Sequence, residues 1–263
     1  MKKTFAIMLA SSLLLLGSCV KNEVPSADQP PVKKGFQLEF GSGFNTGMNA
    51  VDDFGISIAL IVDVSGSMAN RPDSGGEPKY IQAAGALKTV SLYLEKLAKT
   101  QKDLKVNVAV IKFSSEVSTV LPLTAMDEGG FAKLNAACVP ENFDPKGGTA
   151  IGLALERGSE ILAQSGTIFN SMIIVTDGAN TILPEPAKVI KAIYSNANNK
   201  STADFTVRTS TQLMSFIGFD IDSHIFDEFH ELGARITSAV NQSELETSLK
   251  SLLEADITKL EGN

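Results

Sequence analysis

Three short apolar runs rich in β-branched residues divide this chain, and a turn of small or polar residues follows each of them. The runs are Gly55–Val62, Val106–Phe113 and Ser171–Thr176. Their length and their scarcity of polar positions are typical of strands that are buried on both faces of a sheet. We therefore predict a central sheet that is covered on both sides.

Apolar residues at helical spacing separate these runs. In the first segment the apolar residues recur at alternating steps of four and three, at Ala83, Leu87, Val90, Leu94 and Leu97. In the second they repeat at helical spacing, at Ile151, Ala154, Leu155, Ile161 and Leu162. The second helix is expected to begin close to Thr149. Further helices are predicted at 131–139, 186–197, 225–232 and 243–253, the last opened by a capping box of Ser243 and Glu246. Further strands are predicted at 117–123, 213–217 and 236–240, with Pro122 marking a sheet edge or strand end.

Strands that alternate with helices indicate an α/β fold. We predict a doubly wound, mostly parallel central sheet flanked by helices on both faces, because right-handed crossovers place successive helices there. In the strand order 3-2-1-4-5-6, the first and fourth strands are neighbours on either side of the point where the order reverses, and ligands bind beyond their carboxyl ends. Asp63 and Asp177 follow the predicted first and fourth strands.

Length and charge restrict the class of protein. A chain of 263 residues fits one α/β domain with attachments. The formal net charge is −7 and the basic residues form no cluster, which argues against nucleic acid and against adsorption to anionic lipid by charge alone. An acidic chain remains compatible with cation binding.

The beginning of the chain has the pattern of a targeting segment. Lys2 and Lys3 precede an apolar stretch at 5–16 that is short for a membrane span. The LGSC sequence of residues 16–19 resembles the lipobox of bacterial lipoproteins, which implies removal of residues 1–18 and a lipid anchor at Cys19. The alternative is a plain secretory signal that is cleaved near Ser18.

The predicted organisation follows from these segments. Residues 1–18 form a signal peptide, 19–50 a flexible tether with an accessory strand at Phe36–Phe40, 51–258 the folded domain, and 259–263 a polar end. Val20 replaces the aspartate that favours retention at the inner membrane in many Gram-negative lipoproteins, so we expect an envelope protein at the outer membrane or cell surface. Cys138, the other cysteine, is expected to be a small core residue without a disulfide partner.

Three separated segments carry the candidate chemistry. They are Asp63-x-Ser65-x-Ser67, Gly147-Gly148-Thr149 and Thr176-Asp177-Gly178, each in a loop at the same predicted edge of the sheet. Their two carboxylates and the hydroxyls of Ser65, Ser67 and Thr149 suit a hard cation such as Mg²⁺, with waters completing an octahedral shell. The absence of nitrogen and thiolate ligands in this set disfavours zinc and copper.

These motifs, in this order, resemble the von Willebrand factor type A (vWA) domain with a complete metal-ion-dependent adhesion site, over about residues 55–253. The resemblance implies a Rossmann-like vWA fold and direct ligation of the ion by the Ser65 and Ser67 hydroxyls. Thr149 would bind directly or through water, and Asp63 and Asp177 largely through waters. The implied ion is Mg²⁺, with Mn²⁺ or Ca²⁺ as alternatives, and it would coordinate an Asp or Glu carboxylate of a protein partner. The insertion at 70–78 departs from the family pattern and reshapes the expected binding rim.

We therefore predict a non-enzymatic, membrane-anchored protein-binding module for adhesion or envelope-complex assembly. One alternative is a hydrolase in which the same cation activates water, although the motifs supply no general base. Another is a structural domain whose metal only stabilises loops. Asp220, Asp222 and His224 could form a second metal site, but we favour a solvated loop after a strand at this position.

Overall fold

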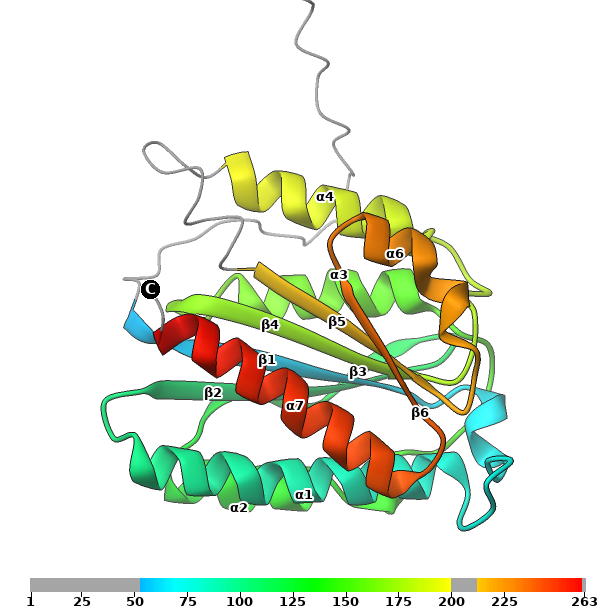
Figure 1. Cartoon of the computed structure of the whole chain (residues 1–263), viewed down its shortest axis with the longest axis horizontal. Coiled ribbons are helices and arrows are strands. Elements are labelled where there is room, and N and C mark those ends of the chain that lie inside the picture. The colour runs from blue at the N-terminus through cyan, green and yellow to red at the C-terminus, as the bar shows by residue number, and fades with distance from the viewer. Residues whose placement is uncertain (1–52, 200–211, 262–263) are drawn as a thin grey trace, which may run out of the picture. The chain divides into compact units, whose positions relative to one another are not determined.

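The apolar runs form the centre of a six-stranded sheet in the computed structural model, which describes residues 53–199 and 212–261 (Figure 1). The strands are β1 (Asp53–Asp63), β2 (Lys105–Phe113), β3 (Val117–Ala125), β4 (Thr167–Thr176), β5 (Gln212–Phe219) and β6 (Arg235–Ala239). The α-helices are α1 (Lys79–Thr100), α2 (Glu128–Ala137), α3 (Ile151–Leu162), α4 (Pro186–Asn199), α6 (Asp227–Glu231) and α7 (Gln242–Glu261). Short 3₁₀ helices are η1 (Gly66–Ala69), η2 (Pro140–Asn142) and η3 (Ser223–Phe226).

The sheet has the order β3-β2-β1-β4-β5-β6, which confirms the predicted order and fold class. β1 pairs in parallel with both β2 and β4, and only β3, at the edge, runs antiparallel to its neighbour among the described strands. Val62 lies opposite Val175 in the β1–β4 register. The loops that begin at Asp63 and Asp177 therefore leave the sheet side by side, at the end shown on the right of Figure 1.

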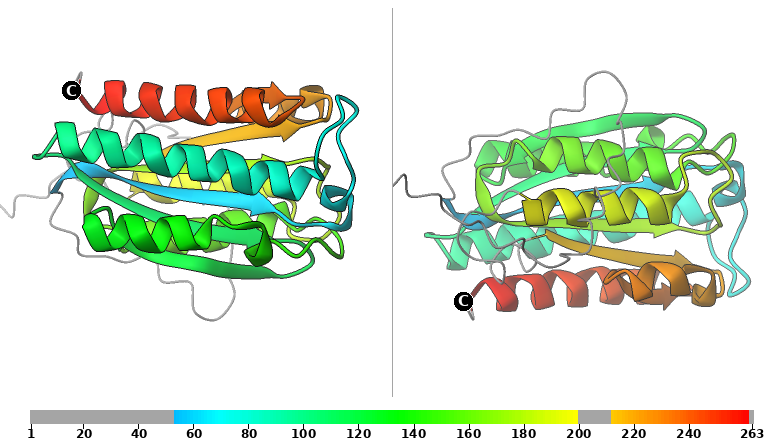
Figure 2. Two further views of the ribbon diagram at one scale, coloured as in Figure 1. Left: turned by 90° about the horizontal axis from the view of Figure 1, so that it is seen from below. Right: turned by 90° about the horizontal axis from the view of Figure 1, so that it is seen from above.

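Side chains alternate between two apolar cores along the central strand. Ile58 and Leu60 of β1 pack toward α1, α2 and α7, whereas Ala59 and Ile61 pack toward α3, α4 and α6. Figure 2 shows these two helical layers on opposite faces of the sheet. Full burial of a side chain such as Ile61 stabilises the fold by roughly 1.5–3 kcal/mol. The prediction that β1 is buried on both faces is therefore confirmed. Packing on both faces fixes the positions of the strand ends from which the loops at the sheet edge start.

The final helix begins and ends at other residues than predicted. The N-cap is Asn241, whose side-chain oxygen accepts the Glu244 N–H at 3.0 Å, while Glu244 Oε2 accepts the Val240 N–H at 3.1 Å. The predicted capping box of Ser243 and Glu246 is thus wrong, and the same spacing operates two residues earlier. A tertiary contact explains this register, because Gln242 N–H donates to Gln82 Oε1 of α1 at 2.7 Å. α7 continues to Glu261 rather than ending at 253.

Other expectations concern the cysteines and the start of the chain. Cys138 is buried with a free thiol, as predicted, and burial raises its pKa to about 12. Cys19 and the expected strand at Phe36–Phe40 lie outside the described residues. Within residues 53–199 and 212–261, no helix combines the length and apolar character needed to cross a bilayer.

The first turn of α3 lies directly against the loop that follows β4. Asn180 Oδ1 accepts the Ile151 N–H at 2.8 Å, so this loop satisfies one of the free amides at the helix start. A Cβ atom on Gly152 would lie only 2.2 Å from the Pro184 carbonyl oxygen. The loop can therefore pack this closely only because residue 152 has no side chain.

We predict that Gly152→Ala lowers the free energy of unfolding by about 1–3 kcal/mol, because the new methyl group displaces backbone atoms of a packed loop. Chemical denaturation followed by circular dichroism measures this change. Gly129→Ala in α2 is the control, because its Cβ would meet nothing closer than 3.5 Å. The control should leave stability unchanged or raise it by up to about 1 kcal/mol. Equal effects of the two substitutions would contradict the close packing at Gly152.

Candidate metal centre

Asp63 joins the carboxyl ends of the two central strands. Its Oδ1 accepts the Ser65 N–H at 2.7 Å, and its Oδ2 accepts the Thr176 hydroxyl at 2.5 Å. The residue is fully buried. Burial raises its pKa to about 6, the hydrogen bonds from Thr176 and Ser65 oppose that rise, and the nearby charge of Asp177 adds to it. A cation at this position would favour the ionised carboxylate.

The two serines form a bridge between the loop after β1 and the loop after β4. The Ser65 and Ser67 hydroxyl oxygens lie 3.1 Å apart, and Ser67 Oγ donates to Asp177 Oδ1 at 2.7 Å. The 3₁₀ turn η1 begins at Gly66, so the chain curls immediately after β1 and presents both hydroxyls on the same side as Asp177. Residues 110 positions apart in the sequence thus share one hydrogen-bond network.

Backbone hydrogen bonds bring the third segment to the same place. Gly66 N–H donates to the Gly147 carbonyl at 3.0 Å, and Lys146 N–H donates to Val64 at 2.8 Å. Gly147 has φ 77°, which favours glycine, and this turn leads directly into Thr149. The Thr149 hydroxyl oxygen would lie 3.8 Å from a Cβ on Gly178, so it faces the residue next to Asp177.

All five predicted ligand residues therefore converge at one edge of the sheet. They are Asp63, Ser65, Ser67, Thr149 and Asp177, and all but Ser67 are buried. Among the described residues, no group of three or more His, Cys, Asp or Glu side chains is arranged to hold a metal. Two carboxylates with three neutral hydroxyls form a hard, all-oxygen donor set, and this set fits Mg²⁺ or Mn²⁺ better than a transition metal that prefers nitrogen or sulfur.

A lysine and a further aspartate belong to the same network. The sequence motifs do not indicate Lys79, and they place Asp220 only in an alternative second metal site. Lys79 Nζ pairs with Asp177 Oδ2 at 3.1 Å and with Asp220 Oδ2 at 3.0 Å. Burial by itself lowers the pKa of Lys79, but the hydrogen bonds and charges of Asp220 and Asp177 outweigh it and raise the pKa above its ordinary 10.5. The amino group is therefore charged at neutral pH. One signal was present in the sequence, since Asp220 follows β5 as Asp177 follows β4.

The alternative second metal site does not assemble in this structure. Asp220 faces Lys79, whereas Asp222 accepts the His224 N–H at 3.0 Å and caps η3. The His224 ring lies 3.3 Å from Asp227, and His230 Nδ1 lies 3.2 Å from the Ala234 carbonyl oxygen. The expectation of a solvated loop holds for Asp222 and His224, but it is wrong for Asp220, whose side chain is only 11% exposed.

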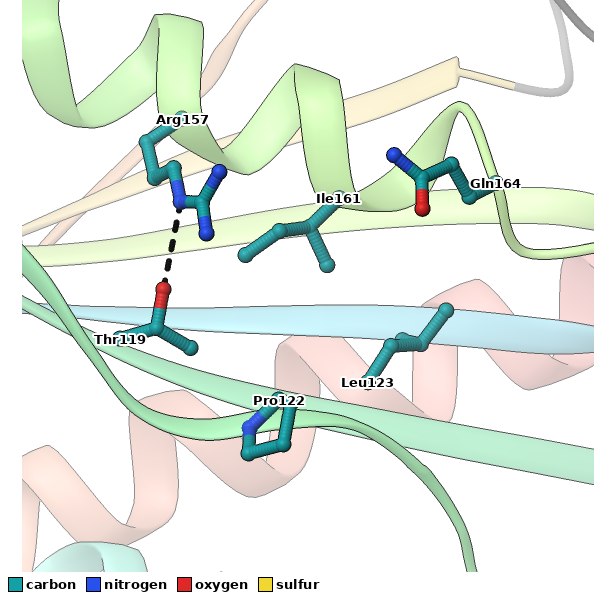
Figure 3. A pocket seen from close by; sticks show the side chains of 6 residues that line it. All are labelled: Thr119, Pro122, Leu123, Arg157, Ile161 and Gln164. Atoms are coloured by element: carbon teal, nitrogen blue, oxygen red, sulfur yellow. Dashed lines mark hydrogen bonds between the residues drawn. The ribbon is translucent and has the colours of Figure 1, made fainter.

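A separate hollow of about 340 Å³ lies between β3 and the second half of α3 (Figure 3). Its lining residues are Thr119, Pro122, Leu123, Arg157, Ile161 and Gln164. Arg157 Nε donates to Thr119 Oγ1 at 3.2 Å across it. None of the lining residues belongs to the Asp63–Asp177 network, so the chemistry predicted from the motifs lies at a different place.

The raised pKa of Asp63 predicts a pH dependence of stability in the metal-free protein. A carboxyl with an unfolded pKa of 3.8 and a folded pKa of about 6 contributes stability that is fully present below 3.8 and is lost as the pH rises through 6. We expect up to about 3 kcal/mol of this contribution to disappear between pH 4 and 7. Denaturant unfolding with chelator across this range measures it.

The matched control for this pH dependence is Asp63→Asn, which removes the titrating group. The pH dependence of the free energy of unfolding in wild type minus that in the variant isolates the contribution of residue 63. Saturating Mg²⁺ should reduce the loss at neutral pH, because a bound cation stabilises the ionised carboxylate. Identical pH dependence in wild type and variant would show that Asp63 titrates normally in the folded protein.

Comparison with known proteins agrees with this architecture. A family model described as von Willebrand factor type A domain matches residues 58–180, which include the five candidate ligands. Comparison with curated proteins finds no match. Many solved structures are similar to this chain.

One of them is a von Willebrand factor type A structure from Catenulispora acidiphila, with TM-score 0.55, 18% identity and coverage of 76% of this chain and 42% of that chain. The second is the pilus adhesin SpaC from Lactobacillus rhamnosus GG, with TM-score 0.53, 19% identity and coverage of 77% and 30%. The third is the vWF domain of the type V pili tip protein Mfa5 from Porphyromonas gingivalis, with TM-score 0.58, 12% identity and coverage of 81% and 97%.

The chain spans less than half of the C. acidiphila and L. rhamnosus structures, so the likeness concerns only a part of those proteins. At identities below 20%, the likeness concerns the fold alone. The family match runs from within β1 to the loop after β4, and the three similar structures cover 76–81% of this chain. Together with the observed strand order, these findings support a von Willebrand factor type A domain, and the chain has the Rossmann-like fold of that family.

Proposed function

We propose that this chain is a protein-binding module that engages an acidic residue of its partner through a divalent cation. Asp63, Ser65, Ser67, Thr149 and Asp177 would hold the ion, which is Mg²⁺ in this proposal, with Mn²⁺ or Ca²⁺ as alternatives. The ion would supply a Lewis-acidic position for a carboxylate oxygen of the partner. The assignment as a binding module rather than an enzyme is part of this proposal.

The observation that carries the proposal is the convergence of three hydroxyls with only two carboxylates. Ser67 Oγ donates to Asp177 Oδ1, Ser65 Oγ lies 3.1 Å from Ser67 Oγ, and Thr149 faces Gly178. Neutral hydroxyls neutralise less of a divalent charge than carboxylates would. A cation held in this way keeps much of its attraction for an incoming carboxylate, as an adhesion site requires.

The hydrogen bonds of Asp63 support the proposal that the hydroxyls, rather than this carboxylate, bind the ion directly. Both of its oxygens already accept hydrogen bonds from Ser65 and Thr176, so it supplies charge and orientation from a fixed position.

A loop beside the centre adds a surface for a partner. Leu183 is 73% exposed, and its loop is tied to Thr149, whose carbonyl accepts the Thr181 N–H at 2.8 Å. A partner that offers a carboxylate to the ion would therefore also meet an apolar side chain.

The setting of this module is part of the proposal. The lipobox-like LGSC sequence at 16–19 supports lipidation of Cys19, and Val20 supports an outer-membrane or cell-surface position rather than the inner membrane. The similar structures include a pilus adhesin and the tip protein of a type V pilus. Adhesion to an external ligand and assembly of an envelope complex are both compatible with such a site.

We predict that Asp63→Ala abolishes measurable Mg²⁺ binding, because it removes a carboxylate charge and the acceptor that orients Ser65. Thr149→Val should weaken binding roughly tenfold, because it removes one hydroxyl oxygen of the donor set. Isothermal titration with Mg²⁺ and with Mn²⁺ measures both effects. Asp144→Asn is the matched control, because this exposed acid precedes the Thr149 loop and pairs only with Lys146 among the contacts the structure shows. Unaltered affinity in the Asp63 and Thr149 variants would refute the site.

The partner experiment uses crosslinking and pull-down from native membranes, with and without chelator. A partner captured by wild type should be lost with chelator and with Asp63→Ala, and retained by Asp144→Asn. A partner list that does not change with chelator would contradict cation-mediated binding. Trypsin treatment of intact cells separates the two settings, because only a surface-displayed domain is removed from the cells.

A further inference from the structure

Lys79 places a fixed positive charge behind one of the candidate ligands. It is the first residue of α1, and its side chain is only 10% exposed. Asp177 accepts the Lys79 ammonium at Oδ2 and the Ser67 hydroxyl at Oδ1. One carboxylate therefore faces the hydroxyl cluster with one oxygen and a permanent cation with the other.

Asp220 shares this ammonium and is itself firmly held. Its Oδ2 pairs with Lys79 at 3.0 Å, and its Oδ1 accepts the Asp73 N–H from the insertion at 3.1 Å. Its own N–H donates to the Ala239 carbonyl at 2.7 Å, and its φ of 56° is uncommon for a residue other than glycine. The insertion, the end of β5 and the start of α1 thus combine to fix a Lys79 that is shared between two carboxylates.

We propose that Lys79 is a built-in counter-cation that lowers the affinity of the centre for free divalent cations and leaves a bound ion more attractive to the partner's carboxylate. This inference rests on the proposed function, since it concerns the same ion. Asp220 reduces the effect, because its negative charge compensates part of the positive charge of Lys79. The centre would then hold its ion most strongly when an acidic partner completes it.

The direction of the effect follows from comparing two influences of Lys79. Its hydrogen bond orients Asp177, which favours metal binding, and such supporting contacts change metal affinity about 10–100-fold. Its charge repels a divalent ion that the other oxygen of the same carboxylate would bind, directly or through water. At an effective dielectric constant of about 20, that repulsion corresponds to more than about a hundredfold in ion affinity before Asp220 offsets part of it. Asp177 also keeps its Ser67 hydrogen bond when Lys79 is removed, so we expect the charge to dominate.

The test compares Mg²⁺ and Mn²⁺ affinities of the full chain by isothermal titration in four Lys79 and Asp220 variants. Lys79→Met removes charge and hydrogen bond, whereas Lys79→Gln removes the charge but keeps an N–H donor. Both should bind Mg²⁺ roughly tenfold more tightly than wild type. Lys79→Arg, which keeps the charge, should stay within about threefold of wild type, and Asp220→Asn should bind more weakly.

The control is Lys146→Met, which removes an exposed charge from the Thr149 loop, where Lys146 pairs with Asp144. Solvent screens this charge, so the affinity should not change. A second readout is the shift in melting temperature between chelator and saturating Mg²⁺. That shift should be larger in Lys79→Met than in wild type, because tighter binding stabilises the folded state more at the same Mg²⁺ concentration.

Two results would overturn the inference, and they are distinct from failure of the proposed function. If Lys79→Met and Lys79→Gln both bind Mg²⁺ more weakly than wild type, Lys79 acts only by orienting Asp177. If both match wild type, Lys79 has no influence on the ion. If wild type itself binds neither Mg²⁺ nor Mn²⁺, the proposed function is wrong and this inference falls with it.

Discussion

The buried carboxylate of Asp63 is the constraint on which the candidate centre depends. It is fully enclosed, yet it accepts hydrogen bonds from Ser65, at the start of the first loop, and from Thr176, the last residue of β4. An ionised carboxylate in such a place is costly unless its oxygens are paired. Those two contacts hold the ends of β1 and β4 together and direct the chain after each strand. The remaining donors lie close together because these two loops start from one fixed point.

The sheet makes this arrangement possible. β1 and β4 are neighbours in parallel, so their carboxyl ends lie at one edge although more than 100 residues separate them in the sequence. Two apolar cores, one on each face, hold the strands in register. The Thr149 segment reaches the same edge through backbone hydrogen bonds to residues 64 and 66. Apolar packing on both faces of the sheet therefore fixes the positions of the polar candidate ligands at its edge.

Charge is distributed unevenly around the centre. Asp63 and Asp177 face the hydroxyl cluster, while Lys79 and Asp220 lie behind Asp177 as a paired cation and anion. The loop of residues 70–78 supplies the Asp73 N–H that Asp220 accepts. This loop thus helps to hold Asp220, and through it Lys79, next to Asp177. Fold likeness at low sequence identity carries no information about such a pair.

The sequence by itself determined the strand order and the five candidate ligands. Double burial of strands and the turn after Asp63 are local signals, and parallel topology places strand ends together by a general rule. The metal and the partner stay predictions. Only the tertiary structure revealed Lys79 and Asp220 as neighbours of Asp177, because a lysine opening a helix and an aspartate after a strand have no local feature that indicates pairing across three elements. The start of α7 at Gln242 was decided in the same way, by its contact with Gln82. Side-chain partners distant in sequence depend on packing, whereas strands and turns depend mainly on neighbouring residues.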